Sequence, residues 1–227
     1  MDPGGHPLDP HLLGPPAVAP VRGVQAPLTG RPRFYSYDNL GTPPEDSRCS
    51  CGHAAIASLL DFHDRVPLPP ALRTVRGEAL ADDGRLHFPN ELLVRQLFAA
   101  HPPVSLPGVR FVTREIIQQA MRQAGLRVGE AWPPLLGSDA SRFATARQSL
   151  CEWISRTGLP AVTLVDMKPL FGSGDLHWGL IHAFDNQGVW MASWHQVSHH
   201  PWERFAAAWH CQGWIYPNNF YALFVTP

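Results

Sequence analysis

The stretch Cys49-Ser50-Cys51-Gly52-His53-Ala54-Ala55-Ile56-Ala57-Ser58-Leu59-Leu60-Asp61-Phe62 predicts a loop that leads into a buried helix. Apolar side chains recur after Cys51 at three- and four-residue spacing, as one packed helical face requires. Ser50 is a typical N-cap residue, so we expect Cys51 at the first helical position. There the unpaired N–H groups and the positive end of the helix dipole favour an anion such as a thiolate. The sequence therefore predicts Cys51 as a reactive cysteine.

A nucleophilic thiolate needs a base, which must come from elsewhere in the chain. The segment Asp175-Leu176-His177-Trp178-Gly179-Leu180-Ile181 places a histidine at the start of an apolar strand. We therefore expect Cys51 and His177 to meet in the folded protein.

The composition is that of a soluble globular protein. Of the 227 residues, 44% are hydrophobic and 16% are charged, which supports a core large enough for one domain. The formal net charge is -1, and no long run of either sign occurs. This balance argues against nucleic acid or an anionic membrane as the main partner.

The four cysteines, at positions 49, 51, 151 and 211, do not form the pattern of a disulfide framework. Cys49 and Cys51 are too close in sequence to bridge without strain, so a reducing compartment is expected. Neither a signal peptide nor a transmembrane run is visible. We expect a cytoplasmic location or export by a system that needs no signal peptide.

The chain divides into a flexible Pro/Gly-rich arm over residues 1–32 and one domain over residues 33–227. In the domain, helical periodicity and caps predict helices over 89–98 with Asn90 as the cap, from Thr113 to Gly125, and over 141–156. Strands are predicted over 126–128, 160–166, 177–184, 189–193 and 220–225, with a hairpin turn over 185–188 and a short helix from 201 to 209. Helices followed by an antiparallel sheet indicate an α+β fold.

These blocks resemble papain-like cysteine peptidases. The resemblance is greatest to the branch that cleaves double-glycine leaders of bacteriocins, together with its stand-alone bacterial relatives. It rests on Cys51-Gly52 with the apolar helix, on the helix and strand over 150–166, and on His177-Trp178 with its hairpin and Trp202-Glu203-Arg204-Phe205. It implies a papain-like fold, no cofactor and no metal, a peptide or protein substrate, and Cys51 and His177 as catalytic residues.

The chain departs from the family pattern at two positions. The family has an Asp or Asn at the end of the strand that returns from the hairpin, where it orients the imidazole. Ser193 stands there in this chain, and we retain it as the third catalytic position, with His195 and Gln196 as the alternatives that could orient His177 through a hydrogen bond. The family also has a Gln about six residues before the cysteine as an oxyanion donor, but here Glu45 takes that offset, and an ionised carboxylate cannot donate. Asn39 and the Cys51 backbone N–H are the replacements that the sequence offers.

The other cysteine, histidine and tryptophan side chains near these segments are expected to have structural roles. Cys49 is expected to be a loop thiol, and His53 a partly exposed helix residue. His182 follows His177 by an odd number of residues, and side chains alternate along a strand. It is therefore expected on the opposite face of the strand, in a structural role. Trp178 and Trp194 are expected in the core or the cleft wall. A zinc site built on His195, His199, His200 and His210 is an alternative, but His195 and His199 share a face only if that segment is helical.

We therefore expect a thiol-dependent hydrolase, a cysteine peptidase, in which Cys51 attacks an amide or ester carbonyl and forms a thioester. The same machinery supports deamidation or acyl transfer when another nucleophile resolves the thioester. A catalytically inactive papain-like module that binds peptides is the third alternative, suggested by the missing acid at Ser193. The Pro-rich arm would suit a bacterial effector or toxin.

Overall fold

The computed structural model describes residues 50–63, 65, 79–80, 86–87, 89–107, 109–131, 137–172, 174, 176–193, 196–210 and 220–227. The predicted arm over 1–32 and the residues Asn39, Glu45, Cys49, Trp194 and His195 lie outside these ranges. The described helices are α2 (Cys51–Phe62), α4 (Pro89–Ala100), α5 (Arg114–Gln123), α6 (Asp139–Thr157), α7 (Lys168–Phe171) and α8 (Trp202–Trp209). The described strands are β1 (Ala79–Leu80), β2 (Leu86–His87), β3 (Val104–Leu106), β4 (Val109–Phe111), β5 (Arg127–Ala131), β6 (Ala161–Asp166), β7 (Leu176–Phe184), β8 (Gly188–Ser193), β9 (Gln196–Pro201) and β10 (Ala222–Thr226).

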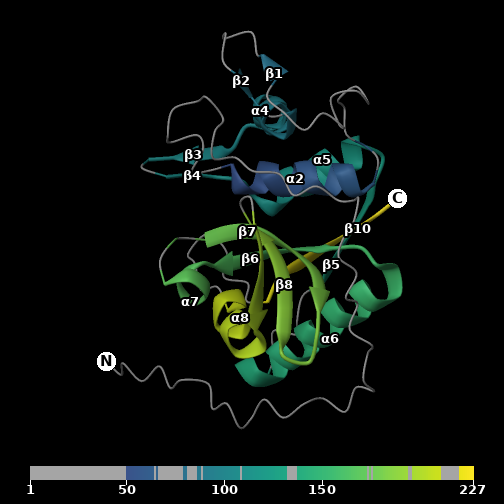
Figure 1. Cartoon of the computed structure of the whole chain (residues 1–227), viewed down its shortest axis with the longest axis vertical. Helices are drawn as coiled ribbons and strands as arrows, with labels where there is room; N and C mark the ends of the chain where they lie inside the picture. Colours follow the sequence, from purple (N-terminus) through teal and green to yellow (C-terminus); the bar gives the residue numbers. More distant parts are fainter. Residues whose placement is uncertain are drawn as a thin grey trace.

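The centre of the fold is a six-stranded sheet in the order β5-β10-β6-β7-β8-β9. Every neighbouring pair in it is antiparallel. Helices cover both faces, with α2, α4 and α5 on one side and α6, α7 and α8 on the other (Figure 1). The predicted α+β class is confirmed. Two further pairs, β1–β2 and β3–β4, form small separate sheets.

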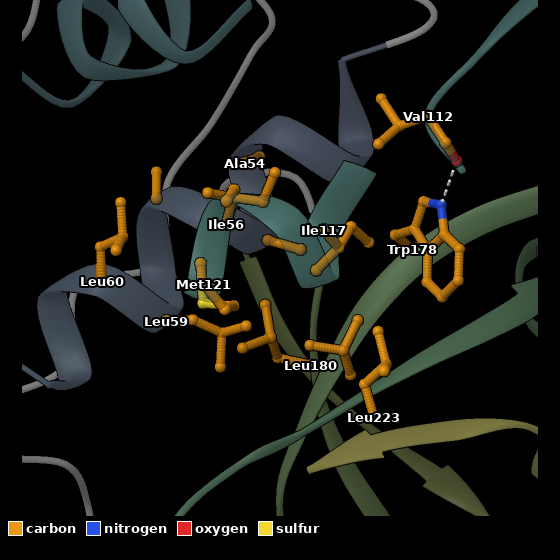
Figure 2. Packing of buried hydrophobic residues seen from close by; sticks show 14 of the residues in the cluster. Ala54, Ile56, Leu59, Leu60, Val112, Ile117, Met121, Trp178, Leu180 and Leu223 are labelled. Atoms are coloured by element: carbon orange, nitrogen blue, oxygen red, sulfur yellow. Dashed lines mark hydrogen bonds between the residues drawn. The ribbon is translucent and has the colours of Figure 1, made fainter. Parts of the chain in front are cut away.

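Each face of the sheet carries its own core. The first core joins α2, α4 and α5 to one face, through residues such as Ile56, Leu59, Leu180 and Leu223 (Figure 2). The second core joins α6, α7 and α8 to the other face, through residues such as Leu150 and Phe205. Because side chains alternate along a strand, one strand supplies both cores. Strand β6 is buried along almost its whole length for this reason, as its run of apolar residues predicts.

The helix boundaries follow local signals in the sequence. Thr113 caps α5, and its hydroxyl accepts a hydrogen bond from the Ile116 N–H at 3.4 Å. Helix α6 begins after Ser138, earlier than predicted, and ends at Gly158, whose φ of 66° is left-handed. Helix α4 begins at Pro89, so Asn90 lies in its first turn rather than at its cap. Proline is favoured at a first helical position because its missing N–H has no helical partner there.

Candidate functional site

Cys51 is the first residue of α2, as predicted, and its side chain is buried. Ser50 takes the N-cap position, and its carbonyl accepts from the Ala54 N–H at 3.0 Å. Its hydroxyl makes no capping hydrogen bond, and the first turn contains no acidic residue. The positive end of the helix dipole is therefore not offset by a carboxylate within the helix, which favours an anion at this end.

A close contact fixes the first turn of α2. A Cβ on Gly52 would lie 2.5 Å from the Cβ of Val112, so only glycine fits against this side chain. The Val112 carbonyl accepts a hydrogen bond from the Trp178 indole N–H at 2.8 Å (Figure 2). Val112 therefore joins the start of α2 to the start of β7, and Trp178 is a core residue, as predicted.

His177 is the second residue of β7 and is buried. It pairs with Val165, which belongs to the second core, whereas the next pair, Leu164 with Trp178, belongs to the first core. By strand alternation, position 177 lies on the sheet face opposite α2. His177 therefore lies at the beginning of β7, outside the layer in which Trp178 packs against α2.

The third predicted position, Ser193, is the last residue of β8 and pairs with Gln196. The register Leu180–Ala192 places it at the end of the hairpin where β7 begins. Asp185 lies at the opposite end, in the predicted turn, where its carboxylate accepts from the Gln187 and Gly188 N–H groups. The backbone thus brings positions 177 and 193 to the same end of two paired strands.

Two histidines outside the predicted pair, His53 and His182, are shielded from water. His53 is fully buried, so the prediction of partial exposure is wrong. Its Nε2 lies 2.7 Å from the His101 carbonyl oxygen, which makes Nε2–H the donor, and burial lowers the pKa of His53 to about 4. His182 lies at an irregularity in the β7–β8 register, and burial lowers its pKa to about 4 as well. Both side chains are therefore neutral at physiological pH.

The predicted alternative of a zinc site required a helix over His195 to His199, and this condition is not met. Residues Gln196–Pro201 form strand β9, so the helical spacing that His195 and His199 would need is not formed. His199 instead lies 3.3 Å from the Asp185 carboxylate, and His200 lies 2.7 Å from the Ser198 hydroxyl. Within the part of the chain that the structure describes, no cluster of three or more metal-ligating side chains occurs. No described helix is both long and apolar enough to cross a membrane.

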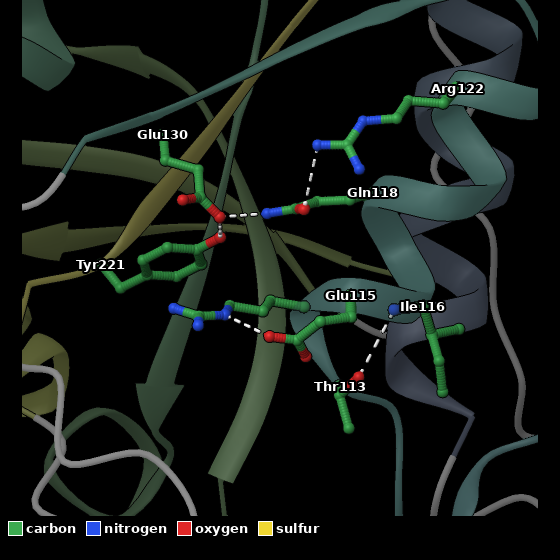
Figure 3. Close-up of polar contacts among 8 residues, drawn as sticks. Thr113, Glu115, Ile116, Gln118, Arg122, Glu130 and Tyr221 are labelled. Atoms are coloured by element: carbon green, nitrogen blue, oxygen red, sulfur yellow. Dashed lines mark hydrogen bonds and ion pairs between the residues drawn. The ribbon is translucent and has the colours of Figure 1, made fainter.

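A polar network that the sequence did not predict ties α5 to the outer strands (Figure 3). The Glu130 carboxylate accepts from the Tyr221 hydroxyl at 2.9 Å and from the Gln118 amide. Burial raises the pKa of Tyr221, and the neighbouring Glu130 raises it further. Tyr221 also meets Trp178 edge to face, with ring centroids 6.1 Å apart. No local pattern signals this network, because Tyr221 is 91 residues from Glu130 in the sequence and meets it only when β10 pairs with β5.

The comparisons with known proteins give a distant likeness among solved structures. No family model matches the chain, and no curated protein matches it. Among solved structures, the chain is similar to a double glycine motif protease from an AMS/PCAT transporter, solved in complex with the leader peptide. The identity is 12%, the TM-score is 0.42, and the alignment covers 86% of this chain and 91% of that chain. Similarity at this level is too low to argue from, so the functional assignment rests on this chain's own residues.

Proposed function

We propose that the protein is a thiol-dependent hydrolase of the papain type that acts on a peptide or protein substrate. The observation that supports this most is the position of Cys51 at the start of α2. There, Val112 and Trp178 hold the first helical turn beside the beginning of β7, the strand that contains His177. A cysteine at a helix start, next to a histidine-bearing strand, is the arrangement that activates a thiol.

In this proposal the Cys51 thiolate attacks the substrate carbonyl carbon, and the bond to the leaving group breaks as a thioester forms. The His177 imidazolium gives its proton to the leaving amine. The neutral imidazole then takes a proton from the water that hydrolyses the thioester. The Cys51 N–H and Asn39 would donate to the oxyanion, and Ser193 would orient the imidazole in place of an acid.

The strength of the helix dipole shows why a partner for the thiolate is needed. A helix terminus stabilises a nearby charge by roughly 0.3–1 kcal/mol, and by about 2 kcal/mol in a partly buried site. Cys51 is only 9% exposed, and burial disfavours a thiolate. The dipole alone therefore does not guarantee an ionised cysteine, whereas an imidazolium within contact distance adds a full opposite charge.

The experiment is alkylation with iodoacetamide over a range of about pH 5 to 9, with each modified cysteine located by mass spectrometry. Cys151 is the internal control, because burial raises the pKa of its thiol to about 11. We expect Cys51 to react at a pH at which Cys151 does not. We also expect the pH midpoint of Cys51 labelling to rise toward the ordinary value of about 8.5 in His177→Ala.

A second function, a papain-like module that binds peptides without cleaving them, is favoured by one observation. The end of β8 contains Ser193 where a catalytic acid would stand, and Asp185 lies at the far end of the hairpin. If Cys51 labels no faster than Cys151, and His177→Ala changes nothing, the hydrolase proposal is wrong and the module is the better assignment. Replacing Ser193 with Asp would then also fail to raise the labelling rate.

A further inference from the structure

A hollow lies between α6 and the outer strands β5 and β10, on the sheet face opposite α2. Its volume is about 410 Å³, which is within the range of small-molecule sites, roughly 300–1,000 Å³. Its lining comes from the last turns of α6 and from the two strands, and includes Arg127, Gly129, Glu152, Trp153, Arg156 and Phe224. We call it the α6–β5 hollow.

The hollow exists because Gly129 has no side chain. A Cβ at this position would have open space around it, with the Phe224 carbonyl oxygen as its nearest neighbour at 4.0 Å. Phe224 is the cross-strand partner of Gly129, and an aromatic residue in that place often covers a strand glycine. Here its ring stacks on Trp153 instead, with centroids 4.8 Å apart and an angle of 24°. The space above Gly129 is therefore left open beside an aromatic surface, and a glycine inside a strand often marks the close approach of a ligand.

The charges around the hollow favour an anion. Arg127 shares the face of Gly129 by strand alternation, and its Nε–H donates to the Pro227 backbone oxygen at 3.0 Å, which uses one of five guanidinium donors. Arg156 supplies a second guanidinium from the last turn of α6. Of the two acidic residues, Glu130 belongs to the opposite face, where Tyr221 and Gln118 bind its carboxylate (Figure 3). Glu152, whose carboxylate accepts from the Gln148 amide at 2.8 Å, is the lining carboxylate on the side of the two arginines.

We propose that the α6–β5 hollow binds a small ligand that combines a planar ring with one anionic group. The ring occupies the space above Gly129 and contacts Phe224, and the phosphate or carboxylate lies between Arg127 and Arg156, with the hydroxyls of Ser149 and Thr226 as further donors. Guanidinium groups bind both anions through paired N–H donors. Two sources share this chemistry, a nucleoside monophosphate and an aromatic carboxylate.

Calorimetric titration of the full chain tests the proposal, with AMP and indole-3-acetate as the two complete ligands. Adenosine, which lacks the anion, and inorganic phosphate, which lacks the ring, are the partial ligands. We expect at least one complete ligand to bind and to bind more tightly than the partial ligands, and its identity distinguishes the two sources. Removing the guanidinium in Arg127→Met is expected to weaken binding about tenfold, as the loss of a charged hydrogen bond does.

Three further variants complete the test. Gly129→Leu fills the hollow without a backbone clash and is expected to abolish binding, with unchanged circular dichroism. Arg204→Met removes an exposed arginine from α8, away from the hollow, and is expected to leave binding unchanged. The proposal is overturned if neither complete ligand binds at about 5 mM, if adenosine binds as tightly as AMP, or if Gly129→Leu binds normally. Cys51→Ala should bind like the unmodified chain, so this result is independent of the proposed hydrolase activity.

Discussion

At the scale of single residues, burial decides which side chains can carry charge. His53 and His182 are both held neutral because their surroundings exclude water, and the pKa of each is lowered from 6.5 to about 4. The same cause raises the pKa of Cys151 to about 11 and keeps it a thiol. Buried histidines are therefore structural in this protein unless a nearby charge stabilises the imidazolium.

The buried histidines predict loss of stability in mild acid. Their folded pKa lies below the unfolded value, so between about pH 6.5 and pH 4 the unfolded chain binds more protons and the free energy of unfolding falls as the pH falls. For His53 alone, the full effect is about 3 kcal/mol at most. Urea unfolding of His53→Gln should show a shallower decrease between about pH 7 and pH 5 than the unmodified chain does. An identical decrease in both chains would contradict this assignment.

Gly52 gives a second prediction at this scale. Replacing an interior helix glycine by alanine usually stabilises a helix by roughly 0.5–1 kcal/mol. Here the added Cβ would lie 2.5 Å from Val112, so Gly52→Ala should instead destabilise the protein, by about 1–3 kcal/mol.

The matched control for Gly52 is the double variant Gly52→Ala with Val112→Gly. Glycine at 112 removes the Cβ that would clash, so chemical unfolding should give a positive coupling between the two changes. Additive effects would mean that Val112 is not the residue that requires glycine at position 52. In the single variant, the displaced first turn should also slow alkylation of Cys51.

At the scale of elements, short-range signals in the sequence set where helices begin and end, and tertiary contacts set how the elements pack. Helix α6 ends because of a local signal: Gly158 has a φ of 66°, and its N–H donates to the Ile154 carbonyl at 2.8 Å. The placement of β7 depends on tertiary contacts, because Trp178 and Leu180 pack under α2 while Ile181 packs on the opposite face.

Gly158 allows the free-energy cost of a left-handed backbone conformation to be measured without any steric clash. A Cβ there would meet nothing within 4 Å, so Gly158→Ala adds only the strain of a left-handed non-glycine residue. We expect a loss of about 1 kcal/mol in thermal or chemical unfolding. Gly158→Asn should cost less, since asparagine tolerates this conformation best among residues with a side chain. Equal losses would point to a cause other than the backbone angle.

At the scale of the whole molecule, the sheet is shared between two cores. Leu180 and Ile181 are neighbours in β7, yet Leu180 belongs to the first core and Ile181 to the second. Because the strands are common to both cores, neither core can lose its packing without disturbing the other. We therefore expect the described part of the chain to unfold in one cooperative transition.

Leu180→Ala and Ile181→Ala test this cooperativity. Each should destabilise the protein by roughly 2–5 kcal/mol, because both side chains are almost fully buried. Tryptophan fluorescence and far-ultraviolet circular dichroism should give coincident transitions in both variants. Separate transitions for the two signals would show that the two cores unfold independently.

The sequence by itself determined the class of fold and most of its longer elements, whereas the short pairs β1–β2 and β3–β4 and strand β9 were not predicted. The three- and four-residue spacing after Cys51, the Thr113 cap, and the Asp185 hairpin each act over a few residues, so a short window contains all the information they need. For the same reason, Cys51 could be placed at the helix start from sequence, and His177 near the start of its strand.

Tertiary structure alone decided the contacts between distant segments. The burial of His53, the contact of Gly52 with Val112, and the open space above Gly129 depend on residues that lie tens of positions away. Local periodicity assigns a face to a side chain, but it does not specify which atoms will meet that face. Those contacts arise only when the sheet and its two layers of helices pack together, and they decide where a thiol is held and where a hollow remains.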